Sequence, residues 1–328
     1  MQDLLERFWA GEPRALARLI SILENEEPGR DELMRQIFSK TGRAYLLGVT
    51  GSPGTGKSSL VDRLTALLRR QGLKVGIVAV DPTSPFSGGA LLGDRIRMQE
   101  HAVDQGVFIR SMGTRGSLGG LASTTKEVVK AMDAFGFDWV IVETVGVGQA
   151  ELDIMHVADS VIVVLTPGAG DSIQTIKAGI MEIADLFAVN KSDLAGADKV
   201  ALEVEMMLDM HSPRVSWRPP VIKTSTVTGA GLEDLLAAIE KHRACLLAQG
   251  LFQQRREARL RSETLEILDR QWQQLVRKEM KFSEEVNDLL AAVARRQTDP
   301  YTAASLILNY VVANSGPREK GQTARAGK

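Results

Sequence analysis

The chain has 328 residues, 44% of them hydrophobic and 25% charged, a composition typical of one large globular domain or two domains. Its 40 basic and 41 acidic residues give a net charge of -1, which argues against nucleic acid as the main partner because nucleic-acid binding normally requires a basic excess. The single Cys245, the acidic opening stretch and the absence of an apolar run of roughly 20 residues exclude a disulfide framework, a secretory signal and a membrane helix. We therefore expect a cytoplasmic protein.

The first 43 residues are predicted to form short amphipathic helices. In the stretch EPRALARLISILENEE, the residues Leu16, Leu19, Ile20 and Leu23 recur at helical spacing. The stretch RDELMRQIFSKTGR repeats the pattern. Residues 1–43 are therefore interpreted as an N-terminal helical extension.

Residues 44–250 alternate apolar runs with helical patterns. The predicted strands are 44–50, 74–80, 107–112, 139–144, 160–166, 186–190 and 220–225. Nearly continuous apolar strands joined by helices indicate a sheet that is covered on both faces and is mostly parallel. The fold class is therefore α/β, a mostly parallel sheet with helices on both faces.

Beyond residue 250 the strand signal stops. Residues 251–315 read as helices, and residues 316–328 as a disordered tail. The apolar positions of these helices form stripes: Leu260, Leu265, Leu268, Trp272, Leu275, Val276, Leu289, Leu290, Val293, Leu306, Ile307 and Tyr310. From the pattern alone, these stripes fit a helical cap on the core as well as an isologous dimer interface.

A phosphate-binding loop follows the first predicted strand. The stretch G-S-P-G-T-G-K-S fits the pattern G-x-x-x-x-G-K-[ST] and lies between a strand and a helix. Its glycines let backbone N–H groups approach the phosphates, Lys57 spans the β- and γ-phosphates, and Ser58 takes a Mg²⁺ position. The predicted nucleotide contacts here are Gly51, Ser52, Pro53, Gly54, Thr55, Gly56, Lys57, Ser58 and Ser59.

Two later loops indicate which base is bound. The stretch FAVNKSDL follows the sixth predicted strand and contains Asn190, Lys191 and Asp193. A carboxylate at position 193 can accept hydrogen bonds from N1–H and the 2-amino group of guanine, whereas adenine offers neither donor. After the last strand, the loop of Ser225, Thr226 and Val227 can present a backbone N–H to guanine O6. The sequence therefore predicts GTP.

Acidic residues at strand ends are candidates for the metal and the hydrolytic step. Glu143 ends a strand, and Gly146 is predicted to sense the γ-phosphate. Asp81 ends another strand at the same crevice and is predicted to act with Glu143 at the Mg²⁺ site, although it also fits a turn before a proline. Asp94 fits an acidic role near the metal and the cap of a following helix equally well.

The water-positioning glutamine of many GTPases has no obvious counterpart. Gln149 comes three residues after Gly146, not directly after a D-x-x-G sequence. We therefore expect slow intrinsic hydrolysis that a partner stimulates.

Together these motifs resemble a known family. The stretches GSPGTGKSSL, VAVDPTSPFSGGALLGDRIRM, ETVGVGQAE and VNKSDL are similar to those of the GTPases associated with methylmalonyl-CoA mutase, formerly labelled lysine/arginine/ornithine transport ATPases or arginine-kinase-like proteins. The resemblance runs to about Ser315. It implies a homodimeric, GTP-driven chaperone that loads, protects or reactivates an adenosylcobalamin-dependent acyl-CoA mutase.

The resemblance also assigns roles to individual residues. It implies that Lys57 and Ser58 bind phosphate and Mg²⁺, that Asp81 and Glu143 surround the metal and the attacking water, and that Asp193 reads guanine. Lys177 falls in a third loop that responds to the partner in this family. From the sequence alone, Lys177 is equally a solvated helix lysine.

Two alternative functions remain open. One is an ATPase or kinase linked to amino-acid transport, against which the N-K-S-D loop speaks. The other is a metal-insertion GTPase, which normally carries clusters of His and Cys ligands. The four histidines, at positions 101, 156, 211 and 242, are scattered and form no D-x-H-x-x-G pattern, so we expect neither metal delivery nor a corrinoid bound to this chain.

Overall fold

The computed structural model describes residues 1–81, 103–113, 123–144, 150–168, 181–211 and 217–314. The chain divides into two compact units, Met1–Arg256 and Glu257–Lys328. The division falls within helix α11 (Leu251–Phe282). None of the described helices is long and apolar enough to cross a membrane.

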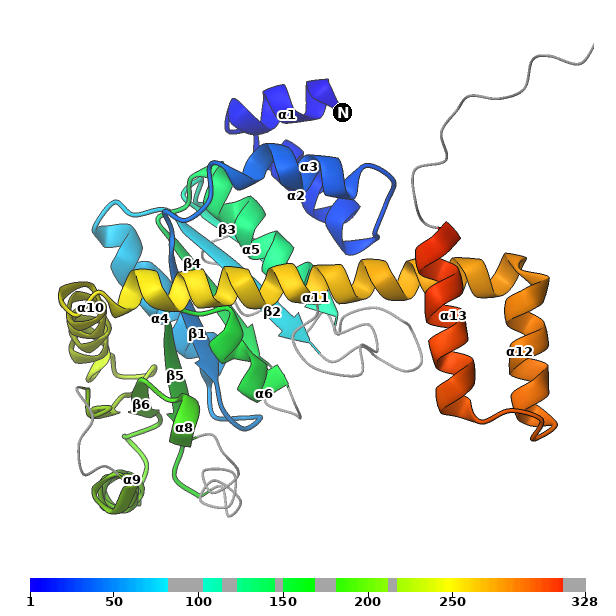
Figure 1. The fold of residues 1–328 in the computed structure, drawn as a ribbon. Helices are drawn as coiled ribbons and strands as arrows, with labels where there is room; N and C mark the ends of the chain where they lie inside the picture. Colours follow the sequence, from blue (N-terminus) through cyan, green and yellow to red (C-terminus); the bar gives the residue numbers. More distant parts are fainter. Residues whose placement is uncertain (82–102, 114–122, 145–149, 169–180, 212–216, 315–328) are drawn as a thin grey trace, which may run out of the picture. The chain divides into compact units, whose positions relative to one another are not determined.

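A seven-stranded parallel sheet forms the centre of the first unit (Figure 1). Its strands are β1 (Tyr45–Thr50), β2 (Val75–Asp81), β3 (Val107–Gly113), β4 (Trp139–Thr144), β5 (Ser160–Leu165), β6 (Leu186–Val189) and β7 (Val221–Lys223). They lie in the order β3-β2-β4-β1-β5-β6-β7, and every pair is parallel. The predicted α/β fold class is confirmed.

The alternation of side chains along the strands builds a core on each face of the sheet. In β4, Trp139 and Ile141 pack on one face with α4 (Lys57–Arg70) and α10 (Leu232–Ala248). Val140 and Val142 pack on the other face, with α5 (Ser123–Phe135). Helix α9 (Ala197–His211) covers the β5–β6 end of that second face. Helices therefore cover both faces, as the apolar strands predicted.

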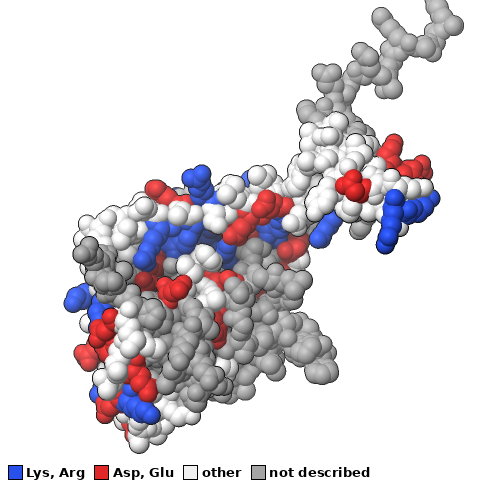
Figure 2. Space-filling model, turned by 60° about the horizontal axis from the view of Figure 1, so that its bottom comes forward, with Lys and Arg blue, Asp and Glu red and all other residues white. Residues whose placement is uncertain are grey.

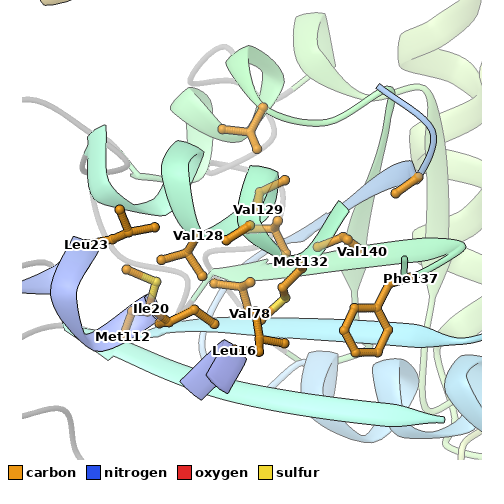
Figure 3. Close-up of a cluster of buried hydrophobic side chains, with 14 of the residues drawn as sticks. Leu16, Ile20, Leu23, Val78, Met112, Val128, Val129, Met132, Phe137 and Val140 are labelled. Carbon is orange, nitrogen blue, oxygen red and sulfur yellow. The ribbon is translucent and has the colours of Figure 1, made fainter. Parts of the chain in front are cut away.

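The N-terminal helices α1 (Gln2–Trp9), α2 (Pro13–Glu24) and α3 (Arg30–Phe38) pack outside α5. Figure 3 shows side chains of α2 meeting those of α5 and of strands β2, β3 and β4. The four apolar positions predicted for α2, at 16, 19, 20 and 23, are all fully buried. The guanidinium of Arg30 also forms a buried ion pair with Glu127 of α5. The predicted amphipathic helices are thus an outer layer of the first unit.

Acidic residues cap the amino edge of the sheet. Asp138, Asp159 and Asp185, here called the amino-edge aspartates, each directly precede a strand. Asp138 accepts the backbone N–H of Lys74, just before β2, at 2.7 Å, whereas Asp159 and Asp185 accept those of the second residues of β1 and β5 at 3.0 and 2.9 Å. These bonds satisfy N–H groups that the sheet ladder leaves unpaired at its margin.

The second unit consists of the remainder of α11, α12 (Glu284–Ala294) and α13 (Pro300–Asn314). Ser283 caps α12 by accepting the backbone N–H of Val286 at 3.3 Å. Val286, Ala303 and Val311 are buried, whereas most of the apolar positions predicted for this region are at least partly exposed.

On the face of the molecule drawn in Figure 2, basic and acidic side chains are interspersed over the described residues.

Candidate functional site

The predicted phosphate loop lies at the carboxyl edge of the sheet. Strand β1 lies between β4 and β5. After β1 the chain first forms the strands on the β4 side of the sheet and then those on the β5 side, so the strand order reverses at β1. Crevices at such a reversal of strand order, beyond the carboxyl ends of the strands, bind ligands in open α/β sheets. Residues 51–56 occupy this position between β1 and α4.

Two glycines of the loop have no room for a side chain. Gly51 has a φ of +134°, and a Cβ there would lie 2.2 Å from the carbonyl oxygen of Val164. Gly56 has a φ of +88°, and its Cβ would lie 2.4 Å from Nδ2 of Asn190. The motif therefore needs glycine at both ends of the loop for the backbone conformation as well as for close approach.

Lys57 begins α4, and its side chain is buried against the loop. Its Nζ donates to the carbonyl oxygens of Gly51 at 2.6 Å and Ser52 at 3.0 Å. The ammonium is thus held at the mouth of the loop, where phosphate oxygens would bind.

Ser58 and Glu143 lie together at the same edge. The Ser58 hydroxyl donates to Oε1 of Glu143 over 2.6 Å, and Glu143 is only 4% exposed. The register explains the meeting, because Glu143 of β4 pairs with Val49 of β1. A hydroxyl and a carboxylate are hard oxygen donors of the kind that Mg²⁺ prefers, so this pair fits the ion.

The predicted base loop is joined to the phosphate loop. Asn190 is fully buried, and its Nδ2 donates to the carbonyl oxygen of Thr55 at 2.8 Å. Lys191 has a φ of +56°, unusual for a residue with a side chain, and its Nζ donates to the carbonyl oxygen of Gly54 at 2.7 Å. The two loops therefore form one continuous site.

Asp193 is oriented by the loop that follows β7. The Ser225 hydroxyl donates to Oδ1 of Asp193 over 2.5 Å, and it accepts the backbone N–H of Thr228 at 3.2 Å. The backbone N–H of Ser192 donates to the carbonyl oxygen of Thr224 at 2.9 Å. Asp193 itself is exposed. The structure thus brings the N-K-S-D loop and the serine-threonine loop into contact.

Two further residues of this edge are absent from the sequence prediction. Arg63 of α4 donates from Nε to the carbonyl oxygen of Thr226 at 3.1 Å. Glu151, in the short helix α6 (Ala150–Asp153), is 8% exposed; burial raises the pKa of its carboxyl, and the positive charge of Lys57 opposes that rise. The only sequence signal for Glu151 is its place at the end of the stretch ETVGVGQAE.

Several predicted residues fall outside the described part of the chain: Asp94, Gly146, Gln149, Lys177, His101 and the tail 316–328. For Asp81 the backbone alone is described. It is the last residue of β2, pairs with Gly113 of β3, and so ends at the same edge as Glu143. Within the described residues, no three His, Cys, Asp or Glu side chains gather in a way that could hold a metal ion.

Comparison with known proteins agrees with this geometry. The family model described as Methylmalonyl Co-A mutase-associated GTPase MeaB matches residues 16–281. A relative in Pyrococcus abyssi whose name describes a GTPase is 47% identical over 315 residues, covering 95% of this chain and 97% of that protein. In Caenorhabditis elegans, the protein named methylmalonic aciduria type A homolog, mitochondrial, is 34% identical over 281 residues, covering 80% of this chain and 70% of that protein.

A solved structure agrees as well. The structure described as LAO/AO transport system kinase is 29% identical, has a TM-score of 0.66, and covers 95% of this chain and 97% of that chain. The family match spans most of the sequence and includes the phosphate and base loops. The chain therefore belongs to the methylmalonyl-CoA mutase-associated GTPases and is a P-loop GTPase that binds GTP and GDP.

Proposed function

We propose that this GTPase is a chaperone for an adenosylcobalamin-dependent acyl-CoA mutase, most directly methylmalonyl-CoA mutase, and that it uses GTP to control cofactor loading, protection or reactivation. The description of the family names the mutase. In this proposal the corrinoid stays on the client and not on this chain. A cytoplasmic location stays a prediction from the sequence.

The observation that carries the nucleotide part of the proposal is the pair of hydrogen bonds between the two loops. Asn190 and Lys191 of the base loop donate to the carbonyls of Thr55 and Gly54 in the phosphate loop. A ligand that reaches both loops must carry phosphates at one end and a base at the other. Because the two loops are braced on each other, binding at one end is expected to support binding at the other.

At the phosphate end, the roles follow from the chemistry of the side chains. Backbone N–H groups of residues 51–59 surround the phosphates, and Lys57 transfers its hydrogen bonds from the loop carbonyls to phosphate oxygens. Ser58 and Glu143 would hold Mg²⁺, with Asp81 as a further acidic group of the same edge. When bound, the ion neutralises charge that develops on the transferred phosphoryl group. Gly146 and Asp94 are proposed to respond to the γ-phosphate.

At the base end, Asp193 is proposed to accept hydrogen bonds from N1–H and the 2-amino group of guanine. Ser225 fixes one carboxylate oxygen, so the side chain loses little freedom when the base binds. Thr226 and Val227 supply backbone N–H groups that face O6.

Homodimerisation is proposed for the second unit. Leu265 and Leu268 of α11 and Leu306 of α13 are each roughly half exposed, and an isologous contact with a second copy would bury them. The test is the molar mass of the purified chain, measured by light scattering over a range of concentrations. A molar mass of the monomer at every concentration would contradict the proposal.

Nucleotide choice is tested by the substitution Asp193→Asn. The amide should reject GTP and accept xanthosine triphosphate, whose C2 carbonyl and N1–H suit an amide. We expect a loss in GTP affinity of about 10²-fold or more, measured by calorimetry. The matched control is Asp198→Asn, an exposed aspartate of α9 that pairs with Lys223. Unchanged GTP binding in Asp193→Asn would mean that the base is read elsewhere.

The client is tested by affinity purification from the native cell with a non-hydrolysable GTP analogue. Recovery of a cobalamin-dependent mutase, and faster GTP hydrolysis when it is added back, supports the proposal. Transfer of the γ-phosphate to an amino acid by the purified chain would favour the transport-linked kinase instead.

A further inference from the structure

Arg63 joins the helix of the phosphate site to the loop that is proposed to read the base. It lies on α4, which begins at Lys57. Its Nε donates to the carbonyl oxygen of Thr226 over 3.1 Å, in the loop between β7 and α10. Neither the phosphate motif nor the N-K-S-D motif contains Arg63, so this contact is a separate feature of the site.

The packing of α4 against α10 brings Arg63 to this loop. Leu64, the next residue of α4, and Leu232, the first residue of α10, are buried in one hydrophobic cluster on the same face of the sheet. The two helices also contact each other directly. Residues 224–231 lead into α10, so the packing holds the loop within reach of the Arg63 side chain.

The loop is held at its two ends by its own hydrogen bonds. The backbone N–H of Ser225 donates to the carbonyl oxygen of Ala230 at 3.0 Å. The backbone N–H of Thr228 donates to the Ser225 hydroxyl at 3.2 Å. Thr226 lies between these anchored residues, and Arg63 holds its carbonyl from α4.

A hydrogen bond to this carbonyl also fixes the direction of the next backbone N–H. Because the peptide group is planar and trans, the carbonyl of Thr226 and the N–H of Val227 point in opposite directions. With Arg63 on the carbonyl, the N–H of Val227 points away from the arginine. The side chain of Val227 is 80% exposed, so its own packing does little to hold this peptide. A charged donor on the carbonyl also polarises the peptide and strengthens its N–H as a donor.

We propose that Arg63 is a positioning residue for base selection: by binding the Thr226 carbonyl, it directs the backbone N–H groups of Thr226 and Val227 toward O6 of guanine. The inference rests on the proposed function, which assigns these N–H groups to O6. Asp193 is proposed to read different atoms of the base, N1–H and the 2-amino group. Because Ser225 has its own bonds to Asp193 and within the loop, loss of the arginine should leave the carboxylate in place.

The test compares the dissociation constants of three diphosphates, measured by calorimetry on the full chain at saturating Mg²⁺. GDP carries every group that guanine offers. 6-Thio-GDP keeps N1–H and the 2-amino group but has sulfur, a weaker acceptor, in place of O6. IDP keeps O6 and N1–H but lacks the 2-amino group. The preference for GDP over 6-thio-GDP therefore measures the reading of O6, and the preference for GDP over IDP measures the reading by Asp193.

The decisive variant is Arg63→Met, which removes the donor and keeps an apolar stem. We expect its preference for GDP over 6-thio-GDP to fall about fivefold, as for the loss of one hydrogen bond. Its preference for GDP over IDP should stay at the wild-type value. The matched control Arg70→Met changes an exposed arginine at the other end of α4 and should leave both preferences unchanged.

The outcomes separate this inference from the proposed function. If the wild type binds no guanine nucleotide, both fail. If the wild type binds GDP and 6-thio-GDP equally well, the proposed contact with O6 fails and the inference fails with it, whereas the comparison with IDP still tests Asp193.

The inference alone fails if the wild type prefers GDP over 6-thio-GDP and Arg63→Met keeps that preference. It also fails alone if Arg63→Met weakens the binding of all three nucleotides by the same factor, because the arginine is then only structural. Should Arg63→Met fold poorly by circular dichroism, Arg63→Ala supplies a second variant without the donor, and an unchanged preference there overturns the inference in the same way.

Discussion

The two edges of the central sheet use acidic side chains in opposite ways. At the amino edge, the amino-edge aspartates accept backbone N–H groups from neighbouring strands, and their bonds stay within the fold. At the carboxyl edge, Glu143 and Asp193 each accept a hydrogen bond from a serine hydroxyl. A hydroxyl is a neutral donor that can rotate away, so these carboxylates can exchange it for a metal ion or a base.

The difference extends to the cations. At the amino edge, Arg256 donates to Asp159 and also to the carbonyls of Gly42 and Ala44. At the carboxyl edge, Lys57 and Lys191 donate to backbone carbonyls of the phosphate loop. The comparison teaches that an aspartate and an arginine of the amino edge are bound to each other and to the backbone, whereas serine hydroxyls and loop carbonyls contact the charged side chains of the carboxyl edge.

The largest expected effect comes from neutralising one acidic residue on each edge. Asp159→Asn would leave the largely buried guanidinium of Arg256 without its ion partner, and we expect it to cost about 3 kcal/mol in the free energy of unfolding. Asp193→Asn, at an exposed position, should cost no more than about 0.5 kcal/mol. Urea unfolding of both variants measures the contrast. Equal losses of stability would show that the two edges do not differ in this way.

A smaller effect is expected from the two kinds of glycine in the phosphate loop. Gly51→Ala places a Cβ against the carbonyl oxygen of Val164 in a conformation that alanine avoids, and should cost about 2 kcal/mol. Gly54 also has a positive φ, of +79°, but a Cβ there meets nothing within 4 Å, so Gly54→Ala should cost about 1 kcal/mol.

Stability and nucleotide affinity are to be measured together on both glycine variants. Gly51→Ala should lower both the stability and the nucleotide affinity, because Gly51 joins β1 to the loop. Gly54→Ala should lower each of them less. If Gly54→Ala is the more damaging variant, steric space is not what distinguishes the two positions.

Much of the fold could be predicted because the strands are nearly continuous apolar runs. Each predicted strand from β1 to β6 agrees with the structure to within one residue at each end. The last strand was predicted over 220–225 and is shorter, because Pro220 lacks an N–H for the ladder and the backbone N–H of Ser225 turns to the carbonyl of Ala230. The serine-threonine loop begins where that strand ends.

The contacts within the site that could be predicted are those between residues of recognised motifs. The contacts that could not be predicted depend on how the elements pack. That Ser58 would meet Glu143 follows from two motifs at adjoining strand ends. The packing of Ile154 beside Gly48, more than a hundred residues earlier in the chain, could not be predicted, because no motif relates the two positions. The amino-edge aspartates had a sequence signal, an Asp directly before a strand, but their acceptor role depends on which strands are neighbours.

The smallest expected effect concerns pH and the amino edge. His242 of α10 is buried, and its Nδ1 lies 2.5 Å from the Ser160 hydroxyl. Burial lowers its pKa from the ordinary value of 6.5; Asp185 and Asp159 oppose the shift, and Arg255 adds to it. As the pH falls through 6.5, the unfolded chain therefore takes up a proton that the folded chain resists, so stability is lost on acidification.

Urea unfolding between pH 7.5 and 5.5 measures this loss, and the difference between variants isolates the histidine. His242→Asn should make the free energy of unfolding fall less steeply with acidification than in the wild type, whatever it costs at pH 7.5. The control His156→Asn, at an exposed position, should keep the wild-type slope. A slope unchanged by His242→Asn would mean that the histidine takes up its proton equally well in the folded state. His242 would then be charged in the folded chain at low pH, and the contrast between the amino edge and the carboxyl edge would rest on the aspartates alone.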